Sequence, residues 1–240
     1  MLHGLDLFTG IGGFAWGLAQ WVRPICYVEI DPYCQAVLKT RFDAGNLPPA
    51  PVWDDVRTFN GKPFKGMVDI ITAGFPCQDI SAAGNAKGLD GERSGLFFQV
   101  LRLAQEIRPQ YILLENVAAI RTRGLETVGR ELAALRYDCR WEIISANETG
   151  APHVRKRWFC LANLVGTRRE GAKGGLFKKK AGGAKPFRNN LPETNWDLPL
   201  ESCLVRVVYG LPFAMDRIKC LGNAVVPAQA AFAFKKLMGV

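Results

Sequence analysis

The stretch MVDIITAGFPCQDIS, residues 67–81, sets the pattern that the rest of the chain follows. Its first half is apolar and β-branched, which indicates a strand buried on both faces of a parallel sheet. Gly74 and Pro76 interrupt the run, so Cys77 is predicted to stand in a constrained loop at the carboxyl end of this strand. Open α/β sheets bind their ligands at that end. Cys77 is therefore a candidate nucleophile, although a single Cys is more often an inert core residue.

The composition is that of a globular protein with a strong basic excess. Hydrophobic residues make up 48% of the 240 residues and charged residues 22%, which excludes a chain disordered throughout. The net charge of +9 indicates a polyanionic partner. Most of the excess lies between residues 164 and 190, where eight Lys and Arg residues accompany a single acid, Glu170.

The cysteines and the apolar runs limit the possible settings. The spacing of the seven Cys residues shows neither paired metal-binding knuckles nor a disulfide framework, so no metal site is expected. There is no apolar leader behind Met1 and no apolar run long enough to cross a bilayer. We therefore expect a reducing, cytoplasmic location without a membrane partner.

A second candidate site lies near the start of the chain. The apolar segment 4–8 runs into the turn Thr9–Gly13, after which an apolar helix pattern begins. A strand, a glycine turn and a helix in this order let a ligand approach the backbone closely. Glu29 lies about 20 residues after Gly10, the separation at which a carboxylate can accept the hydroxyls of a bound ribose. This pattern does not distinguish a nicotinamide cofactor, S-adenosylmethionine or a turn without a ligand.

Further elements follow from caps and periodicity. Asp31-Pro32 predicts the start of a helix, with Asp31 as its cap. A third strand is predicted to end near residues 53–56, where Asp55 could accept from an adenine amino group or serve as a turn residue. Ser94 is predicted to cap a helix that Pro109 stops.

The second half of the chain supplies charged groups to the same sheet edge. The strand predicted at 110–114 should bring Glu115 to the edge that holds Cys77. Alternation within residues 153–157 predicts that Arg155 and Arg157 share one strand face. The glycine-rich segment 79–95 has little periodicity and predicts a loop that closes over a substrate.

Five motifs in sequence order resemble those of the DNA cytosine-5 methyltransferases. They are DLFTGIGGF (6–14), GFPCQDIS (74–81), ENV (115–117), HVRKR (153–157) and GNAVVP (222–227). The resemblance covers residues 4–162 and 201–240. His153 stands where many relatives carry Gln, and the basic insert is short for the family.

The resemblance implies an α/β, Rossmann-like S-adenosylmethionine-dependent methyltransferase fold in three parts. Residues 1–162 would form the catalytic, S-adenosylmethionine-binding domain, and residues 163–200 a small basic target-recognition region. Residues 201–240 would return to the catalytic domain through a helix from about Pro227 to Met238, folded back beside the first strand.

The resemblance also implies a role for each candidate residue. Cys77 would add to carbon 6 of a flipped-out cytosine, Glu115 would meet N3 with a pKa raised by burial, and Arg157 would meet O2. Arg155 would orient Glu115 or hold a phosphate. The expected S-adenosylmethionine contacts are Phe8, Gly10, Gly12, Glu29 for the ribose, Asp55 for the adenine, and Asn223 and Val225 for the amino acid end. The expected DNA contacts are Ser81, Arg168, Arg169, Lys178, Lys179, Lys180 and Lys185.

The expected activity is methyl transfer to cytosine in a short sequence of duplex DNA, by a monomer. A restriction endonuclease would be a partner if the chain is half of a restriction–modification pair, and a phage-borne protective enzyme is the other setting considered. Three rival functions are a tRNA cytosine-5 methyltransferase of the same family, a catalytically silent nucleic-acid-binding relative and an NAD-dependent dehydrogenase. The last leaves Cys77 unexplained.

Overall fold

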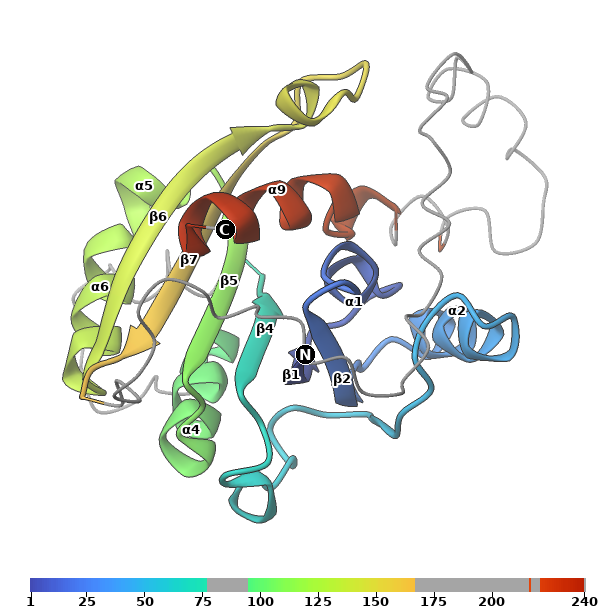
Figure 1. Ribbon diagram of the computed structural model, residues 1–240, viewed down its shortest axis with the longest axis horizontal. Coiled ribbons are helices and arrows are strands. Elements are labelled where there is room, and N and C mark those ends of the chain that lie inside the picture. The colour runs from blue at the N-terminus through green and yellow to red at the C-terminus, as the bar shows by residue number, and fades with distance from the viewer. Residues whose placement is uncertain (77–94, 167–215, 217–220, 240) are drawn as a thin grey trace.

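The computed structural model describes residues 1–76, 95–166, 216 and 221–239, and the remaining residues lie outside the description. Its centre is a seven-stranded sheet in the order β3-β2-β1-β4-β5-β7-β6 (Figure 1). The strands are β1 (Leu2–Leu7), β2 (Val22–Val28), β3 (Val52–Trp53), β4 (Ile70–Gly74), β5 (Tyr111–Val117), β6 (Tyr137–Ser145) and β7 (Lys156–Leu164). The helices are α1 (Gly13–Gly17), α2 (Pro32–Asp43), α4 (Leu96–Ile107), α5 (Ile120–Arg123), α6 (Leu125–Ala134) and α9 (Pro227–Met238), with short 3-10 turns η1 (Lys62–Phe64) and η2 (Ala146–Thr149).

The five strands from β1 to β5 pair in parallel, and β7 is antiparallel to both β5 and β6. Parallel strands need crossover helices, so their apolar side chains are covered on both faces. Within β4, Ile70, Ile71 and Ala73 are all fully buried. The predicted α/β fold class is confirmed, and the strand before residue 77 is present as β4.

Helices cover the sheet on two sides (Figure 1). On one face, Leu5 and Leu7 of β1 share a buried cluster with residues of α4 and α6, such as Phe97 and Leu132. On the other face, helices α1 and α9 contribute to a second buried cluster that includes Leu113 of β5. Helix α2 packs beside α1 in a third cluster.

Two predicted helices have the bounds that their sequence signals indicate. The Asp31 side chain accepts a hydrogen bond of 2.9 Å from the Tyr33 amide and caps α2, which Pro32 begins. Helix α9 runs from Pro227 to Met238, as predicted.

Other boundaries differ from the prediction. Helix α4 is preceded by Gly95 as its cap residue, without a side-chain cap, and the predicted cap Ser94 lies outside the described residues. The helix ends at Ile107 because Arg108 adopts the left-handed conformation, with φ of 56°, and a residue before proline is disfavoured in the helical region. The third strand is only two residues long, and α5 was not predicted.

The C-terminal segment returns to the start of the chain. A Cβ at Gly13 would overlap the Val225 carbonyl oxygen, and one at Gly17 would overlap that of Pro227, so only glycine permits this contact with α1. The buried Gln229 amide donates to the carbonyls of Ile144 (3.0 Å) and Arg155 (2.7 Å), which fastens α9 to the β6–β7 end of the sheet. The return was predicted beside the first strand, whereas the main contacts of α9 are with α1, β6, β7 and η2.

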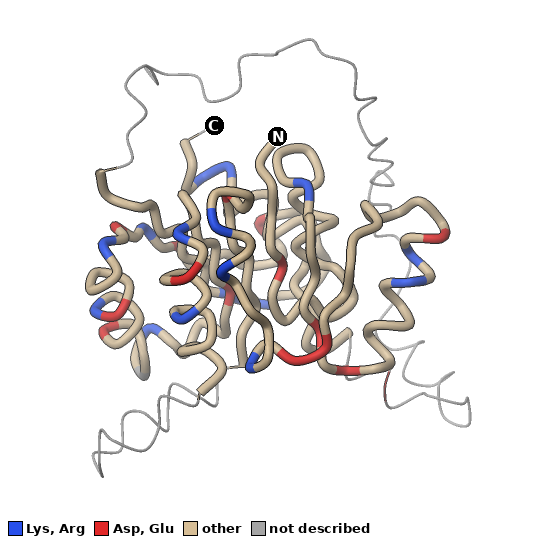
Figure 2. The backbone as a smooth tube through the Cα atoms, turned by 90° about the horizontal axis from the view of Figure 1, so that it is seen from below, with Lys and Arg blue, Asp and Glu red and all other residues tan. Residues whose placement is uncertain are grey.

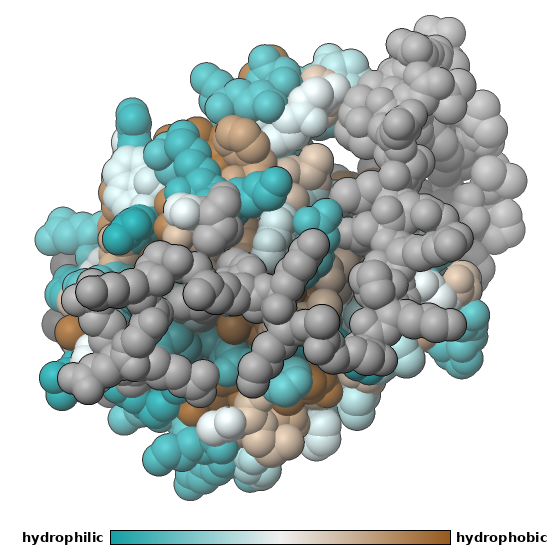
Figure 3. Space-filling model, in the orientation of Figure 1, coloured by the Kyte–Doolittle hydropathy of each residue, from teal (hydrophilic) through white to brown (hydrophobic). Residues whose placement is uncertain are grey.

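Charges of both signs are interspersed over the described part of the chain (Figure 2). The basic residues between 167 and 190, which carry most of the excess positive charge, lie outside the described residues. Hydrophilic side chains cover much of the described surface on the face shown in Figure 3. Among the described helices, none combines the length and the apolar character needed to cross a membrane.

Candidate active site

The ends of four parallel strands, β1, β2, β4 and β5, lie level at one edge of the sheet. Leu7 of β1 pairs with Val28 of β2 and with Ala73 of β4. Gly74 at the end of β4 pairs with Glu115 of β5. This is the carboxyl edge at which open α/β sheets hold their ligands.

Glu115 is a buried charged residue at this edge. Its side chain is 9% exposed, and its Oε1 lies 2.9 Å from Nε of Arg157 on β7. Burial raises the pKa of Glu115 from 4.5 to about 7, although the charges of Arg157 and Arg155 act in the opposite direction. At neutral pH this carboxyl group therefore exists in both protonation states, as a group that gives and takes a proton requires.

The Glu115 carboxylate lies directly over the end of β4. A Cβ built on Gly74 would be 3.3 Å from Oε2 of Glu115 and 3.1 Å from the Val225 side chain. Any larger residue at position 74 would crowd both groups. Gly74 therefore lets the carboxylate approach the backbone three residues before Cys77, which itself lies outside the described residues together with Ser81.

Arg155 and Arg157 have different contacts, although both lie near Glu115. Arg157 forms the ion pair with Glu115, whereas Nη2 of Arg155 donates to the carbonyls of Gly222 (2.8 Å) and Ala224 (3.0 Å). From the sequence, Arg155 was predicted to orient Glu115 or to hold a phosphate, and its contact with the carbonyls of Gly222 and Ala224 was not predicted. Arg155 fixes the GNAVVP segment at the edge of the site, and its charge reaches Glu115 through space.

Asn116 is a site residue to which sequence reasoning assigned no role. Its side chain is 3% exposed, and Nδ2 donates a hydrogen bond of 2.9 Å to the Phe75 carbonyl. Buried polar side chains in a strand are almost always hydrogen-bonded, so an Asn within an apolar run was the available signal. This bond fixes the backbone where it leaves β4 toward Pro76.

The glycine turn between β1 and α1 has left-handed backbone conformations, which would let a ligand approach the backbone closely. Phe8, Gly10 and Gly12 all have positive φ angles, of 53°, 55° and 89°. The Gly10 amide donates to Oε2 of Glu29 at 2.6 Å, and the Asp31 amide donates to Oε1 at 2.8 Å. Burial raises the pKa of Glu29. A carboxylate can accept about four hydrogen bonds, so Glu29 keeps acceptor capacity beyond its contacts with the amides of Gly10, Ile30 and Asp31.

A second buried acid lies in β1 just before this turn. Asp6 is 2% exposed, and its Oδ1 accepts a hydrogen bond of 2.6 Å from the Thr72 hydroxyl. Among the described residues its Oδ2 has no hydrogen-bond partner. Burial raises the pKa of Asp6 to about 7, and the neighbouring Glu29 adds to this effect. Sequence reasoning missed Asp6 because it treated the strand as uniformly apolar.

The other predicted cofactor residues lie on either side of the turn. The Glu29 amide donates to the Trp53 carbonyl at 2.9 Å, which places the end of β3 next to Glu29, and Asp55 follows two residues later. Arg57 donates to both Asp55 oxygens and lowers the pKa of this acid. Val225 packs in the cluster that holds α1, and Asn223 is exposed.

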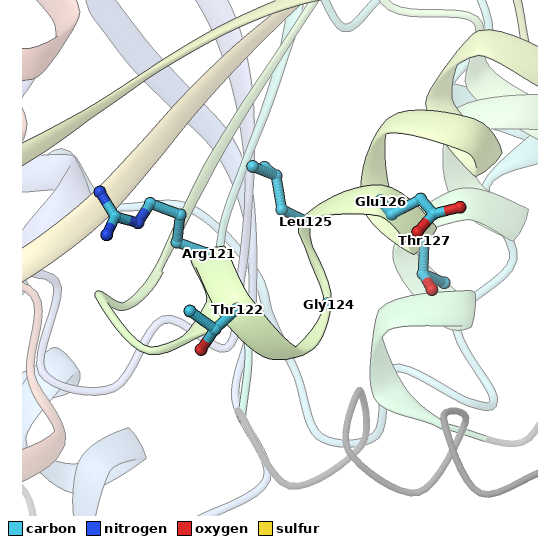
Figure 4. A pocket seen from close by; sticks show the side chains of 6 residues that line it. All are labelled: Arg121, Thr122, Gly124, Leu125, Glu126 and Thr127. Atoms are coloured by element: carbon cyan, nitrogen blue, oxygen red, sulfur yellow. The ribbon is translucent and has the colours of Figure 1, made fainter.

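A cavity of about 240 Å³ lies apart from these groups, where α5 meets α6 (Figure 4). Its lining includes Arg121, Thr122 and Glu126, and neither Glu115 nor Glu29 is among the lining residues. It is not the predicted cytosine pocket. The predicted DNA contacts at positions 168, 169, 178, 179, 180 and 185 lie outside the described residues.

Comparisons with known proteins agree with this arrangement. A family model for C-5 cytosine-specific DNA methylases matches residues 2–205. The type II methyltransferase M.CviJI of Paramecium bursaria Chlorella virus IL3A is 40% identical over 159 residues, which cover 66% of this chain and 42% of that protein. M.HhaI of Haemophilus parahaemolyticus is 32% identical over 165 residues, covering 67% of this chain and 48% of that protein.

A solved structure is similar in fold as well. The Dnmt2 methyltransferase of S. pombe has a TM-score of 0.54 and 29% identity, covering 68% of this chain and 51% of that one. The chain spans less than half the length of the two type II relatives that it resembles. Because the matching family model covers most of the sequence, the chain belongs to the C-5 cytosine-specific DNA methylase family.

Proposed function

We propose that the chain transfers a methyl group from S-adenosylmethionine to carbon 5 of cytosine in duplex DNA. The observation that carries the proposal is the buried Glu115–Arg157 pair, whose carboxylate lies against Gly74, three residues before Cys77 in the sequence. An acid with a pKa of about 7 beside a fixed guanidinium suits a reaction in which charge develops on a pyrimidine ring.

The residues at the glycine turn fit S-adenosylmethionine as the cofactor. Glu29 has lone pairs left for ribose hydroxyls, and the turn presents backbone in a form that admits a ligand closely. The charge of Glu29 adds to the raised pKa of Asp6, and a bound cation would relieve this repulsion. S-adenosylmethionine carries a sulfonium and an ammonium group and supplies the methyl group when bound. Phe8, Gly10, Gly12, Asp55, Asn223 and Val225 are proposed as its further contacts.

Cys77 is proposed as the nucleophile. Carbon 5 of cytosine is too weak a nucleophile to attack a sulfonium methyl group unaided, so a thiolate must first add to carbon 6. An unperturbed thiol has a pKa of about 8.5, and a cationic neighbourhood favours its thiolate form. Arg157 and Arg155 supply positive charge at the edge that Gly74 shares with Glu115.

Glu115 and Arg157 are proposed to hold the opposite side of the ring. Protonated Glu115 donates to N3 while its other oxygen accepts from the exocyclic amino group, and Arg157 donates to O2 as negative charge develops. Arg155 acts on the site indirectly, since it holds the carbonyls of Gly222 and Ala224. The catalytic set is therefore Cys77, Glu115 and Arg157, with Arg155 as a positioning residue.

The DNA contacts and the biological setting are also proposals. The target carbon is inaccessible in a stacked duplex, so the cytosine must be flipped out at a cost of a few kcal/mol. Ser81 and the basic residues between 168 and 185 would hold the surrounding DNA, with affinity that falls as salt rises. The names of the type II relatives favour a restriction–modification system as the setting. The enzyme is further proposed to act as a monomer in the cytoplasm. A cognate endonuclease would then be its functional partner.

A covalent trapping experiment tests the proposal. Duplex DNA that carries 5-fluorocytosine should become attached to the protein when S-adenosylmethionine is present, because fluorine cannot leave carbon 5 as a proton does. The adduct should be absent for Cys77→Ala and present for the control Cys139→Ala, which removes an exposed thiol on β6.

Three outcomes would contradict parts of the proposal. An adduct with Cys77→Ala would mean that another group is the nucleophile. An adduct with structured RNA but not with duplex DNA would favour the tRNA-methylating alternative. No adduct with the wild-type protein on either substrate, despite measurable binding of S-adenosylmethionine, would favour a catalytically silent relative.

A further inference from the structure

One side chain of α4 reaches the segment that follows Asp55. Arg102 donates from Nη2 to the Val56 carbonyl at 2.8 Å and from Nη1 to the Phe59 carbonyl at 3.0 Å. The same guanidinium donates to Gln99 and Glu106 of its own helix, at 2.8 and 2.9 Å. Arg102 therefore joins α4 to two carbonyls of the segment 56–61, which starts directly after Asp55.

Glu106 completes this contact from one turn farther along α4. Its Oε1 accepts a hydrogen bond from Nη1 of Arg102, and its Oε2 accepts a hydrogen bond of 2.8 Å from the Gly61 amide. A Cβ at Gly61 would lie 2.8 Å from the same oxygen, so only glycine permits the approach. The pair thus satisfies two backbone acceptors and one backbone donor of the segment. Charge-assisted hydrogen bonds of this kind are stronger and geometrically more restrictive than neutral ones.

The segment has little other support from the sheet. Strand β3 is only two residues long, and it pairs with β2 through Val52 and Trp53 alone. Beyond it, Thr58 bonds to Trp53 and Asp55 within the segment itself. The position of Asp55 relative to the sheet is therefore set on one side by the short β2–β3 pairing and on the other side by what holds the residues that follow it. Those residues are held by the buried Val56 and Phe59 side chains and by the polar contacts from α4.

We infer that Arg102 is a positioning residue for the adenine side of the cofactor site. This inference rests on the function proposed above, in which Asp55 accepts from the adenine amino group. Arg102 touches neither the substrate nor the cofactor. It acts by fixing the backbone next to Asp55, and its partner Glu106 fixes Arg102 in turn.

Calorimetric titration of the full chain with S-adenosylhomocysteine tests the inference. Arg102→Ala should raise the dissociation constant about tenfold, which corresponds to about 1.4 kcal/mol. Arg102→Lys should show an intermediate loss, because one ammonium group cannot hold the carbonyls of Val56 and Phe59 in the same geometry. Arg130→Ala is the matched control, since exposed Arg130 pairs only with its neighbour Glu131 in the described structure and should leave binding unchanged.

Two further measurements distinguish positioning from general damage. In an Asp55→Asn background the loss caused by Arg102→Ala should shrink, because the two changes act on the same contact. The loss should also shrink for an analogue of the ligand that lacks the exocyclic amino group of adenine. Equal losses in both backgrounds, or with both ligands, would overturn the inference.

The remaining outcomes are equally decisive. If the wild-type protein binds neither S-adenosylmethionine nor S-adenosylhomocysteine, the proposed function fails before the role of Arg102 is reached. If the wild type binds S-adenosylhomocysteine and both Arg102 variants bind it as tightly as the wild type does, the inference about Arg102 is wrong. Thermal unfolding of each variant shows whether it is folded, and Arg102→Lys decides the question if Arg102→Ala does not fold.

Discussion

Replacing Glu115 by Gln isolates the effect of burying one acid at the carboxyl edge of the sheet. Gln has the same shape and keeps an oxygen that can accept from Arg157, but it does not titrate. The wild-type carboxyl group has a pKa of about 7 in the folded protein and 4.5 when exposed. The folded protein therefore binds this proton more tightly than the unfolded chain does, and stability depends on pH through this group.

The sign and size of the dependence follow from these two pKa values. The stabilisation from protonated Glu115 is fully present below pH 4.5 and is lost as pH rises through about 7. One pKa unit corresponds to about 1.4 kcal/mol, so the wild type should lose about 3 kcal/mol of unfolding free energy over this range. The Gln variant lacks this loss. Titrations elsewhere in the chain occur in both proteins and cancel when the two are compared.

Urea unfolding of both proteins at pH values from about 5 to 8 measures this difference. The unfolding free energy of the wild type should fall relative to that of Glu115→Gln as pH rises. If the two pH curves are parallel, the pKa of Glu115 is not raised and the argument for a proton donor at this site fails. In methyl transfer assays the same variant should lose about 10²–10⁴-fold in turnover, and a comparable loss of DNA affinity would contradict a role in the chemical step.

Two other substitutions test the neighbours of Glu115. Arg157→Ala should raise the pKa of Glu115 above about 7, because the Arg157 charge lowers it in the wild type. The difference in pH-dependent stability between Arg157→Ala and Arg157→Ala/Glu115→Gln measures this pKa. An unchanged pKa would mean that the pair does not interact. Gly13→Ala should cost about 1–3 kcal/mol of stability, because the new methyl group would displace the Val225 carbonyl. Gly129→Ala on α6 is the control, since no atom lies within 4 Å of its Cβ position, and thermal unfolding that ranks the two alike would refute the proposed contact.

The sequence predicted the parts of the fold that depend on local signals. Asp31 and Pro32 at the start of α2 act within one helical turn, and the apolar run before Gly74 is long enough to identify a buried strand. The signals at short elements were weaker. The two residues of β3 are too few to show an alternation of apolar and polar side chains. Helix α4 has Gly95 as its cap residue, without the side-chain cap that the sequence suggested at Ser94.

The arrangement of the site depended on strand order, which periodicity does not reveal. Alternation predicted that Arg155 and Arg157 share one strand face, but β7 begins at Lys156, so Arg155 lies just before the strand. Alternation also could not show which of the two reaches Glu115. That choice follows from the antiparallel pairing of β7 with β5, in which Glu115 faces Phe159 and Val117 faces Arg157. A shift of one residue would turn the Arg157 side chain to the other face of the sheet.

The contact between Gly13 and Val225 is another feature that sequence patterns could not reveal, because it joins residues from opposite ends of the chain. A run of glycines after β1 is compatible with a close ligand, and the sequence analysis assigned it to the cofactor. The structure shows that Gly10 and Gly12 have the left-handed backbone of the turn, whereas Gly13 and Gly17 admit the returning C-terminal segment. The glycines thus serve two different neighbours, and only the tertiary fold separates them. Since Val225 also lies against Gly74 beside Glu115, the same segment joins the glycine turn to the Glu115 side of the candidate site.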